Sequence, residues 1–347
     1  MDRRDIIVIG ASAGGFEAIK QIVTDLPVDL DAAIFIVWHM AADVRGILPR
    51  VLNMLGTLTA AHATDGETIV SGRIYVAPPD RHLLVETGRV RVTHGPKENL
   101  FRPAVDPLFR SAAVAYGARV IGVVLSGALD DGTAGMWAIK QQGGLAVVQE
   151  PADAQVPSMP VNVINAVKVD YIVPVKEMGA LLSQLVNEHA APNDAPESDF
   201  AIKARMEVLI AMKDEDTSRE LFRQGRLTPY TCPECHGVLT ALLEEQRIRF
   251  RCHTGHAFSA DSLLTSITTD IEKKLWAAIR NIQESTLLLN HIGDHFAEAN
   301  EAKIAAVYFT KAKEAMLRAA LVRRALLDHE QLNMDSVKDQ ADMESFS

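Results

Sequence analysis

Three polar positions in this 347-residue sequence carry the residue types of a hydrolytic triad, and each follows an apolar run. They are Ser12 after residues 6–9, His39 after residues 33–38, and the pair Asp130 and Asp131 after residues 119–126. In acyl transfer a histidine removes the proton of a serine hydroxyl, and a carboxylate orients the histidine and balances its charge. The pattern therefore predicts a serine esterase or a related acyl-transfer enzyme.

The glycines around Ser12 admit two interpretations. Gly10, Gly14 and Gly15 permit a tight turn between a buried strand and a helix, which would expose the Ser12 hydroxyl at the edge of a sheet. The same pattern occurs in glycine-rich phosphate loops, but no Walker lysine follows Gly15, so nucleotide binding is disfavoured. Taken alone, the two aspartates would be explained by a helix cap and a turn.

The elements around these residues predict an α/β fold with a parallel sheet flanked by helices. Residues 15–25 have helical spacing and lie between two apolar runs, which makes a βαβ unit whose strands are parallel. Ser12 and His39 should then meet at one edge of the sheet. Residues 58–95 contain short strands separated by turns, and we expect them to form an added β-hairpin region. These expected strands are Thr68–Val70, Arg73–Ala77 and Leu83–Val85.

The first half of the chain resembles the catalytic domain of the bacterial chemotaxis protein-glutamate methylesterases. The matching segments are Ile9–Gly15, Val37–Met40, Tyr75–Val85, Arg102–Asp106, Leu125–Gly135 and Ser158–Pro160. Their order and spacing agree across about residues 4–185. The triad order Ser, His, Asp differs from the Ser, Asp, His order of the α/β-hydrolases, so a different fold is expected.

The resemblance implies a role for each residue of the triad. Ser12 would be the nucleophile, His39 the general base and Asp131 the orienting acid. Asp131 is preferred to Asp130 because the family's acid immediately precedes the glycine that corresponds to Gly132. The implied reaction is hydrolysis of glutamate γ-methyl esters on chemoreceptors, with deamidation of receptor glutamines as a further activity, and catalysis needs no cofactor.

The resemblance also assigns the oxyanion donors, and here the sequence departs from the family. The backbone amides of Ala13 and Ala128 would bind the oxyanion. Ala128 stands where the family usually has methionine, and Leu129 where it usually has glycine, so we expect a retained donor beside a reshaped substrate groove. Many members carry an N-terminal receiver domain, whereas the first strand here starts near residue 5, and we expect a different mode of regulation. The alternative function is a non-catalytic signalling adaptor that recruits partners through its C-terminal module.

All three cysteines lie in one short segment that has the spacing of a zinc ribbon. Cys232 and Cys235 form one knuckle, and Cys252 and His256 form the second, separated by a hairpin. His253 and His236 are the alternative fourth ligands. Four protein ligands make a structural zinc site, because a catalytic zinc keeps one position open.

The pattern of polar and apolar residues along the chain predicts its domain boundaries and its partners. The boundaries are a catalytic domain at 1–188, a linker at 189–199, a helical connector at 200–228, a zinc-ribbon-like module at 229–260, a helical hairpin at 261–332 and a disordered tail at 333–347. The apolar stripes of the two helices pack either on each other or in a homodimer, and the pair His291 and His295 is explained by an exposed helix face. The chain would act on a methyl-accepting chemotaxis receptor or a related signalling protein.

The charge and hydropathy of the chain exclude other classes of partner. A formal net charge of -10 argues against binding along a nucleic-acid backbone. No apolar run approaches the roughly 18 to 20 residues of a membrane-spanning helix, and the N-terminus has no signal-peptide pattern. We therefore expect a cytoplasmic protein that is not inserted in a membrane.

Overall fold

The computed structural model describes residues 3–39, 46–56, 58–190, 199–244, 247–333, 336–337 and 340. The chain divides into two compact units, Met1–Leu263 and Leu264–Ser347. Each unit is described by itself. The predicted linker falls almost entirely outside the described residues, as does most of the predicted tail.

The centre of the first unit is a seven-stranded sheet in the order β3-β4-β2-β1-β7-β8-β9. All neighbouring strands are parallel, which confirms the predicted fold class. The strands are β1 (Ile6–Ala11), β2 (Ala33–Trp38), β3 (Thr59–His62), β4 (Arg73–Val76), β7 (Val120–Val124), β8 (Leu145–Gln149) and β9 (Tyr171–Val173). The chain builds outward from β1 in one direction and from β7 in the other, so the point between them is where ligands bind in open α/β sheets.

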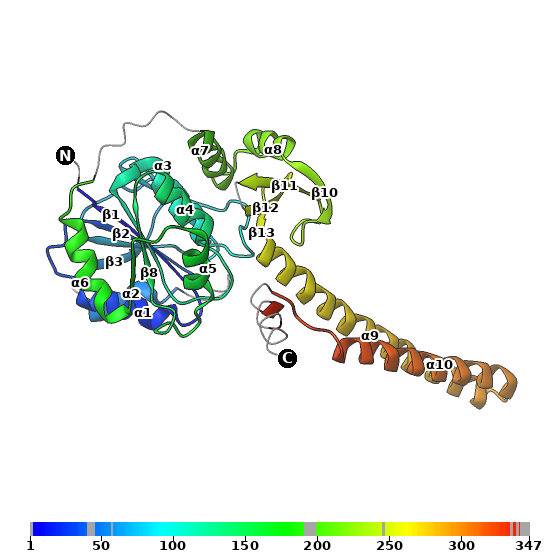
Figure 1. Ribbon diagram of the computed structural model, residues 1–347. Helices are drawn as coiled ribbons and strands as arrows, with labels where there is room; N and C mark the ends of the chain where they lie inside the picture. Colours follow the sequence, from blue (N-terminus) through cyan, green and yellow to red (C-terminus); the bar gives the residue numbers. More distant parts are fainter. Residues whose placement is uncertain are drawn as a thin grey trace. The chain divides into compact units, whose positions relative to one another are not determined.

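Helices cover both faces of this sheet (Figure 1). One face packs on α1 (Gly15–Asp25), α2 (Leu48–Leu55) and α6 (Val175–Val186), and the other on α3 (Val105–Tyr116), α4 (Thr133–Gln141) and α5 (Ser158–Ala166). Along β1, Ile7 and Ile9 face the first layer while Ile6 and Val8 face the second. This explains the unbroken aliphatic run, because a strand buried on both faces needs apolar side chains at every position.

The region 58–95 differs in part from the prediction. The antiparallel hairpin exists, made of β5 (His82–Glu86) and β6 (Arg89–Thr93). Residues 73–76, expected in a hairpin, instead form a parallel strand between β2 and β3. Residues 68–70 form no strand in the structure; Thr68 makes a single bridge and the Val70 amide donates to the Tyr75 hydroxyl over 2.8 Å. Short apolar runs do not by themselves distinguish parallel from antiparallel pairing.

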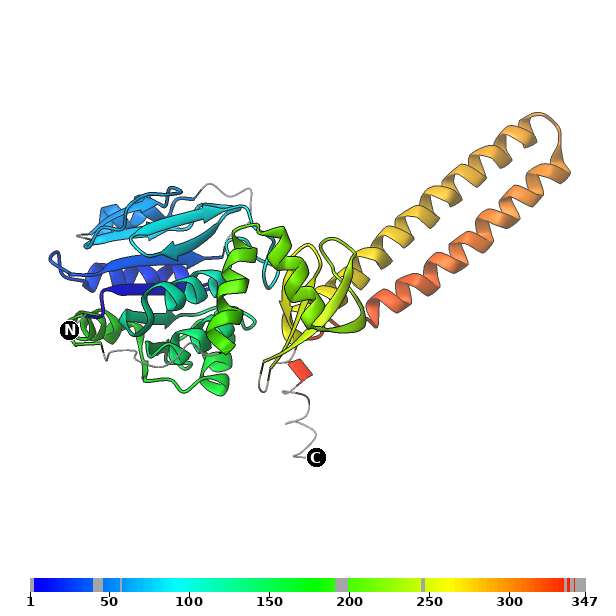
Figure 2. The same cartoon turned by 90° about the horizontal axis from the view of Figure 1, so that it is seen from above.

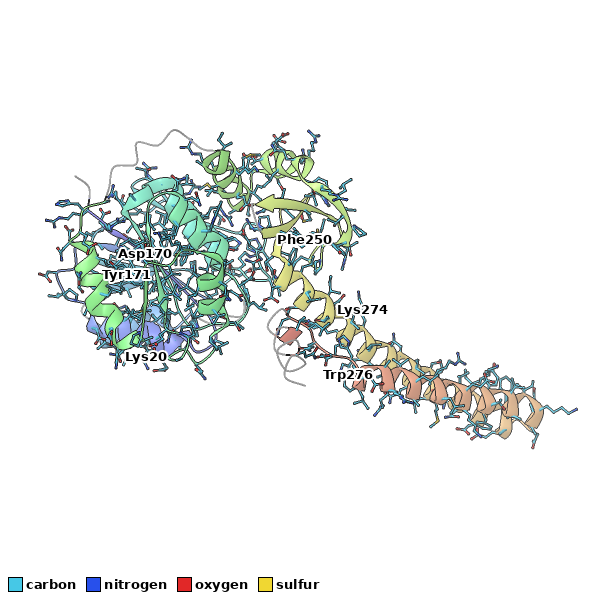
Figure 3. All side chains as sticks on the ribbon, in the orientation of Figure 1. Lys20, Asp170, Tyr171, Phe250, Lys274 and Trp276 are labelled. Carbon is cyan, nitrogen blue, oxygen red and sulfur yellow. The ribbon has the colours of Figure 1, made fainter. Side chains whose placement is uncertain are left out.

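The rest of the first unit contains two helices and a small antiparallel sheet. The helices are α7 (Asp199–Ala211) and α8 (Glu215–Gln224), followed by β10 (Arg226–Thr231), β11 (Val238–Glu244), β12 (Arg247–Cys252) and β13 (Ala257–Ser259). Both helices lie within the segment 200–228 that the sequence analysis describes as a helical connector, apart from the first residue of α7. Strands β10–β13 are called the ribbon below, and its buried core includes Phe250 on β12 (Figure 3).

The second unit is an antiparallel helical pair (Figure 2). It is built from α9 (Ala260–Glu298), whose first residues belong to the first unit, and α10 (Ala302–Leu327). The turn between the helices spans residues 299–301, and Phe296 stacks on Tyr308 with ring centroids 5.6 Å apart. Several large apolar side chains on the pair are exposed, Leu287 among them. Another is Trp276 (Figure 3). Of the helices that the structure describes, none has the length and apolar character needed to span a bilayer.

Candidate active site and metal cluster

The register of the two central strands places Ser12 beside His39. Ala11 of β1 pairs with Trp38 of β2, so the next residue on each strand lies opposite its neighbour at the carboxyl edge of the sheet. The His39 amide donates to the Ala11 carbonyl over 3.0 Å, and the Trp38 indole nitrogen donates to the Ser12 carbonyl over 3.0 Å. Two hydrogen bonds therefore join the strand ends that carry Ser12 and His39.

The turn that carries Ser12 depends on small residues from two loops. The Ser12 amide donates to the Ser126 carbonyl over 2.9 Å, which anchors the turn to the end of β7. Gly14 adopts φ 76°, a left-handed conformation that glycine tolerates. A Cβ on Gly127 would lie 2.7 Å from the Ser12 Cβ and 2.0 Å from the Met159 sulfur, so no larger residue fits there.

His39 is held from two sides and keeps one nitrogen open. Its Nε2 lies 2.8 Å from Oδ2 of Asp131, and its ring stacks on Phe101 at 3.7 Å between centroids. The opposite ring nitrogen, Nδ1, is buried and has no hydrogen-bond partner among the described residues. With Nε2 engaged by Asp131, Nδ1 is the ring nitrogen left without a partner among the described residues.

Asp131, on the loop between β7 and α4, lies against the N-terminus of α3 and is fully buried. It accepts hydrogen bonds from the backbone amides of Val105 (2.7 Å) and Asp106 (3.2 Å), two donors that a first helical turn leaves without intrahelical acceptors. Burial raises the pKa of this carboxyl, but the hydrogen bond and charge of His39, the Val105 amide and the Asn99 side chain outweigh burial and lower the pKa below its ordinary value. Asp131 is therefore held ionised against the imidazole.

A second buried carboxylate, Asp106, lies behind the first. It accepts from the amides of Gly132 (3.1 Å) and Gly135 (2.6 Å), and the Asn99 side chain donates to it over 2.9 Å. Burial, followed by the charges of Asp131 and Glu98, raises its pKa well above the ordinary value. The sequence analysis included Asp106 in the motif Arg102–Asp106 but did not predict these hydrogen bonds. It gave no sign of a role for Asn99.

Asp130 and Asp131 have separate environments despite being adjacent. Asp130 accepts a hydrogen bond from the Ser259 hydroxyl over 2.8 Å, and burial raises its pKa to about 6. The carboxylate that contacts His39 is that of Asp131. The structure therefore distinguishes the two aspartates by their partners, His39 for Asp131 and Ser259 for Asp130.

Ala13 and Ala128 are both exposed residues that follow the carboxyl ends of β1 and β7. Among the described residues neither amide has a hydrogen-bond acceptor, so both can donate to a bound oxygen. Leu129, at the position where glycine was expected, adopts φ 62° and its carbonyl accepts from the Asn162 side chain over 3.1 Å. The turn therefore keeps a left-handed conformation that glycine would adopt more easily, at a cost of about 1–2 kcal/mol for a residue with a Cβ.

The three cysteines and His256 converge in the ribbon. Their ligand atoms all lie within 4.8 Å of one another, and the cluster could hold a metal ion. The Sγ atoms of Cys235 and Cys252 are 3.6 Å apart, and Nδ1 of His256 is 3.6 Å from Cys252 and 3.7 Å from Cys232. Tetrahedral zinc with bonds of about 2.3 Å would separate its ligand atoms by roughly 3.8 Å, so the four atoms fit this ion.

The other histidines near the cluster point elsewhere. His253 packs edge-on against Phe222, with ring centroids 6.4 Å apart, and His236 is the left-handed residue of the first knuckle, at φ 60°. Neither residue belongs to the four-residue group around Cys232. Among the candidates considered from sequence, His256 is the one whose nitrogen faces the thiols.

A buried group of charged residues connects the ribbon and α7 to the loop before α3. We call it the arginine–glutamate cluster; its members are Glu98, Arg110, Glu207, Arg249 and Arg251. Glu98 pairs with Arg110 at 2.6 Å and with Arg249, while Glu207 lies 2.7 Å from Arg249, 2.9 Å from Arg110 and 3.2 Å from Arg251. Three arginines around two glutamates lower the pKa of both carboxyls despite burial, which acts to raise it.

Comparison with known proteins locates the similarity in the first half of the chain. A family model described as CheB methylesterase matches residues 7–182. A Leptospira interrogans protein, named for protein-glutamate methylesterase and protein-glutamine glutaminase activities, is 41% identical over 182 residues, which are 52% of this chain and 94% of that protein. A protein of the same type from Nitratidesulfovibrio vulgaris is 34% identical, with 52% of this chain and 50% of the relative aligned.

A solved structure agrees with these matches. The crystal structure of the Thermotoga maritima CheB methylesterase catalytic domain superposes with a TM-score of 0.51 and 34% identity, and covers 52% of this chain and 98% of that one. The ribbon and the helical pair lie beyond the residues that the family model matches.

Proposed function

The chain belongs to the CheB methylesterase family, and we propose that it hydrolyses glutamate γ-methyl esters on chemoreceptors through Ser12, His39 and Asp131. Deamidation of receptor glutamines is the related activity that the same site could perform, because amides and esters share an acyl carbon. The observation that carries the proposal is the position of His39: its Nε2 is hydrogen-bonded to Asp131, its Nδ1 has no partner among the described residues, and its strand end lies beside the one that carries Ser12.

The reaction follows from these positions. Ser12 Oγ attacks the ester carbonyl while His39 Nδ1 takes the hydroxyl proton, and the ionised Asp131 balances the imidazolium charge. The carbonyl oxygen becomes an oxyanion that accepts from the Ala13 and Ala128 amides; one such donor is worth about 2.7–4 kcal/mol of the barrier. Collapse transfers the proton to the leaving methoxide and releases methanol. Water activated by His39 then hydrolyses the acyl-enzyme and restores Ser12.

We also propose a structural zinc ion bound by Cys232, Cys235, Cys252 and His256. The thiolate and imidazole donors suit zinc, and four protein ligands leave no open position for a substrate. The ion would join the two knuckles of a small sheet whose apolar core is limited. No step of the esterase reaction involves it.

Methanol release from methylated receptor fragments tests the esterase activity. The Ser12→Ala protein should release none above background, and Ser71→Ala is the matched control because that hydroxyl is exposed and donates to Asp31 over 2.9 Å. A fluorophosphonate probe should label Ser12 in the parent chain and leave the His39→Ala protein unlabelled. Equal turnover by the Ser12→Ala and parent proteins would refute the proposal.

A non-catalytic adaptor is the second candidate, favoured by exposed apolar residues on the helical pair. They include Leu287, Leu288, Val307, Met316, Leu317 and Leu321. Such a surface suits a second copy of the pair or another helical protein. The two candidates differ in the probe experiment, since a pure adaptor has no requirement for a reactive Ser12.

A further inference from the structure

Asn99 connects the ribbon to the triad through a side-chain amide whose polar atoms are all engaged. Its Nδ2 donates to Oδ1 of Asp131 over 3.1 Å and to Oδ2 of Asp106 over 2.9 Å. Its Oδ1 accepts from the Ser259 amide over 3.0 Å and from the Ser262 hydroxyl over 3.3 Å. The nitrogen faces two carboxylates and the oxygen faces two donors, so only this orientation satisfies every group.

Because the Asn99 side chain lies between two acids, it affects the pKa of the one that contacts His39. Asp131 must remain ionised to serve His39, and its charge adds to burial in raising the pKa of Asp106 beside it. The Asn99 N–H groups are shared by both carboxylates and lower the pKa of Asp131. An amide rotated or withdrawn from this position would leave both acids without that donor.

The backbone around Asn99 is fixed by the ribbon. The Asn99 amide donates to the Ala257 carbonyl over 2.9 Å, and the Ala257 amide donates to the Lys97 carbonyl over 3.2 Å, so this loop runs beside β13. Asn99 itself has φ 51°, a left-handed conformation that asparagine tolerates better than most residues. Two residues later Phe101 stacks on His39. One loop therefore touches both members of the His39–Asp131 pair.

The residue before Asn99 anchors the same loop to the ribbon by charge. Glu98 pairs with Arg249 of β12 and with Arg110 of α3, and all three side chains are buried. Breaking a buried pair by removing one partner is strongly destabilising, so this anchor resists separation. Consecutive residues thus hold the ribbon, through Glu98, and the triad, through Asn99.

We propose that Asn99 is a positioning residue for the His39–Asp131 pair and that the ribbon, with the Ser262 hydroxyl, sets its orientation. This rests on the proposed esterase function, in which His39 and Asp131 act as a unit. In consequence the ribbon is a working part of the active site, and disturbing its contact with Asn99 lowers turnover without altering the substrate groove.

The first test replaces the amide in the full-length chain. Asn99→Gly introduces a residue that tolerates φ 51°, and Asn99→Asp keeps the shape of the side chain but lacks the Nδ2 donor. Both should lower kcat about tenfold or more on methylated receptor fragments while KM stays within about twofold, because the hydrogen bond acts on a charged group of the reacting pair. Ser183→Ala is the control, since that hydroxyl donates to the Gly179 carbonyl of its own helix over 2.8 Å.

The second test asks whether the ribbon acts through Asn99. Ser262→Ala should lower kcat by a smaller factor, and this loss should vanish when the same change is made in the Asn99→Gly protein. Additive losses, or a Ser262→Ala protein with parental kcat, would overturn the part assigned to the ribbon. Parental kcat in both Asn99 variants would overturn the whole proposal.

A spectroscopic readout separates this proposal from the esterase function. The proton between His39 Nε2 and Asp131 should give a downfield NMR resonance in the parent chain, and its chemical shift should change in Asn99→Gly but not in Ser183→Ala. If the parent hydrolyses no ester, the proposed function fails while the shift still tests the coupling. An unchanged resonance in a folded Asn99→Gly protein would refute the positioning role.

Discussion

Asp131 and Asp106 are two buried carboxylates that share one donor, the Nδ2 atom of Asn99, and yet their pKa values move in opposite directions. Asp131 contacts His39 and its pKa is lowered, whereas burial and the charge of Asp131 raise the pKa of Asp106. Divergent environments for neighbouring acids are how protein sites assign different roles to one residue type. Here they predict which carboxylate matters directly for turnover.

Asp131→Asn should lower kcat by about 10⁴-fold, because an amide cannot balance the imidazolium or hold the reactive tautomer of His39. Asp106→Asn should lower it far less, since Asp106 does not contact the ring. The measurement is kcat on methylated receptor fragments, with circular dichroism to establish folding. If the Asp106 variant were the more damaged of two folded proteins, the assignment of the acid would be reversed.

The metal site should contain about one zinc per chain when the protein is purified without chelators. Cys232→Ser and His256→Ala should lose the metal and lower the melting temperature of the ribbon, because ligand binding and local folding are coupled. His253→Ala is the matched control: the residue is close in sequence but packs on Phe222, so metal should be retained. Elemental analysis showing no zinc in the parent chain would contradict the site.

The arginine–glutamate cluster should contribute strongly to the stability of the folded chain, and a single substitution can measure this contribution. Glu207→Gln removes one of two negative charges from among three arginines, and breaking such a buried pair should lower the free energy of unfolding by about 3–5 kcal/mol. Asp216→Asn, at the exposed pair with Arg219, should change it by no more than about 1 kcal/mol. Urea denaturation measures both, and equal small effects would show that the cluster is dispensable.

The same substitution carries a pH signature whose sign follows from the lowered pKa of Glu207. A carboxyl with a lower pKa in the folded state adds stability that is fully present above its unfolded value, about 4.3, and is lost as pH falls toward the folded value. The parent chain should therefore lose stability below about pH 5, and Glu207→Gln should show a shallower acid dependence. If the stability of the two proteins fell in parallel with decreasing pH, the acid dependence would not come from Glu207.

Some of the site could be read from the sequence because it depends on local pattern. Ser12 and His39 each follow an aliphatic run, and parallel strands separated by one helix bring such positions to the same edge. The spacing of the three cysteines with His256 likewise identified the cluster that the ribbon assembles. In both cases short-range covalent geometry limits where a side chain can go.

Tertiary structure alone decided the rest. Asn99 meets Ser259 and Ser262 across about 160 positions, and Glu207 meets Arg110 and Arg249 from three separate elements. No periodicity encodes such contacts, because they arise when preformed elements dock and buried polar groups must find partners. Likewise the parallel pairing of residues 73–76 with β2 was set by both faces being buried, a condition that local pattern does not contain. The sequence determined which residues could do the chemistry, and docking decided which others hold them in place.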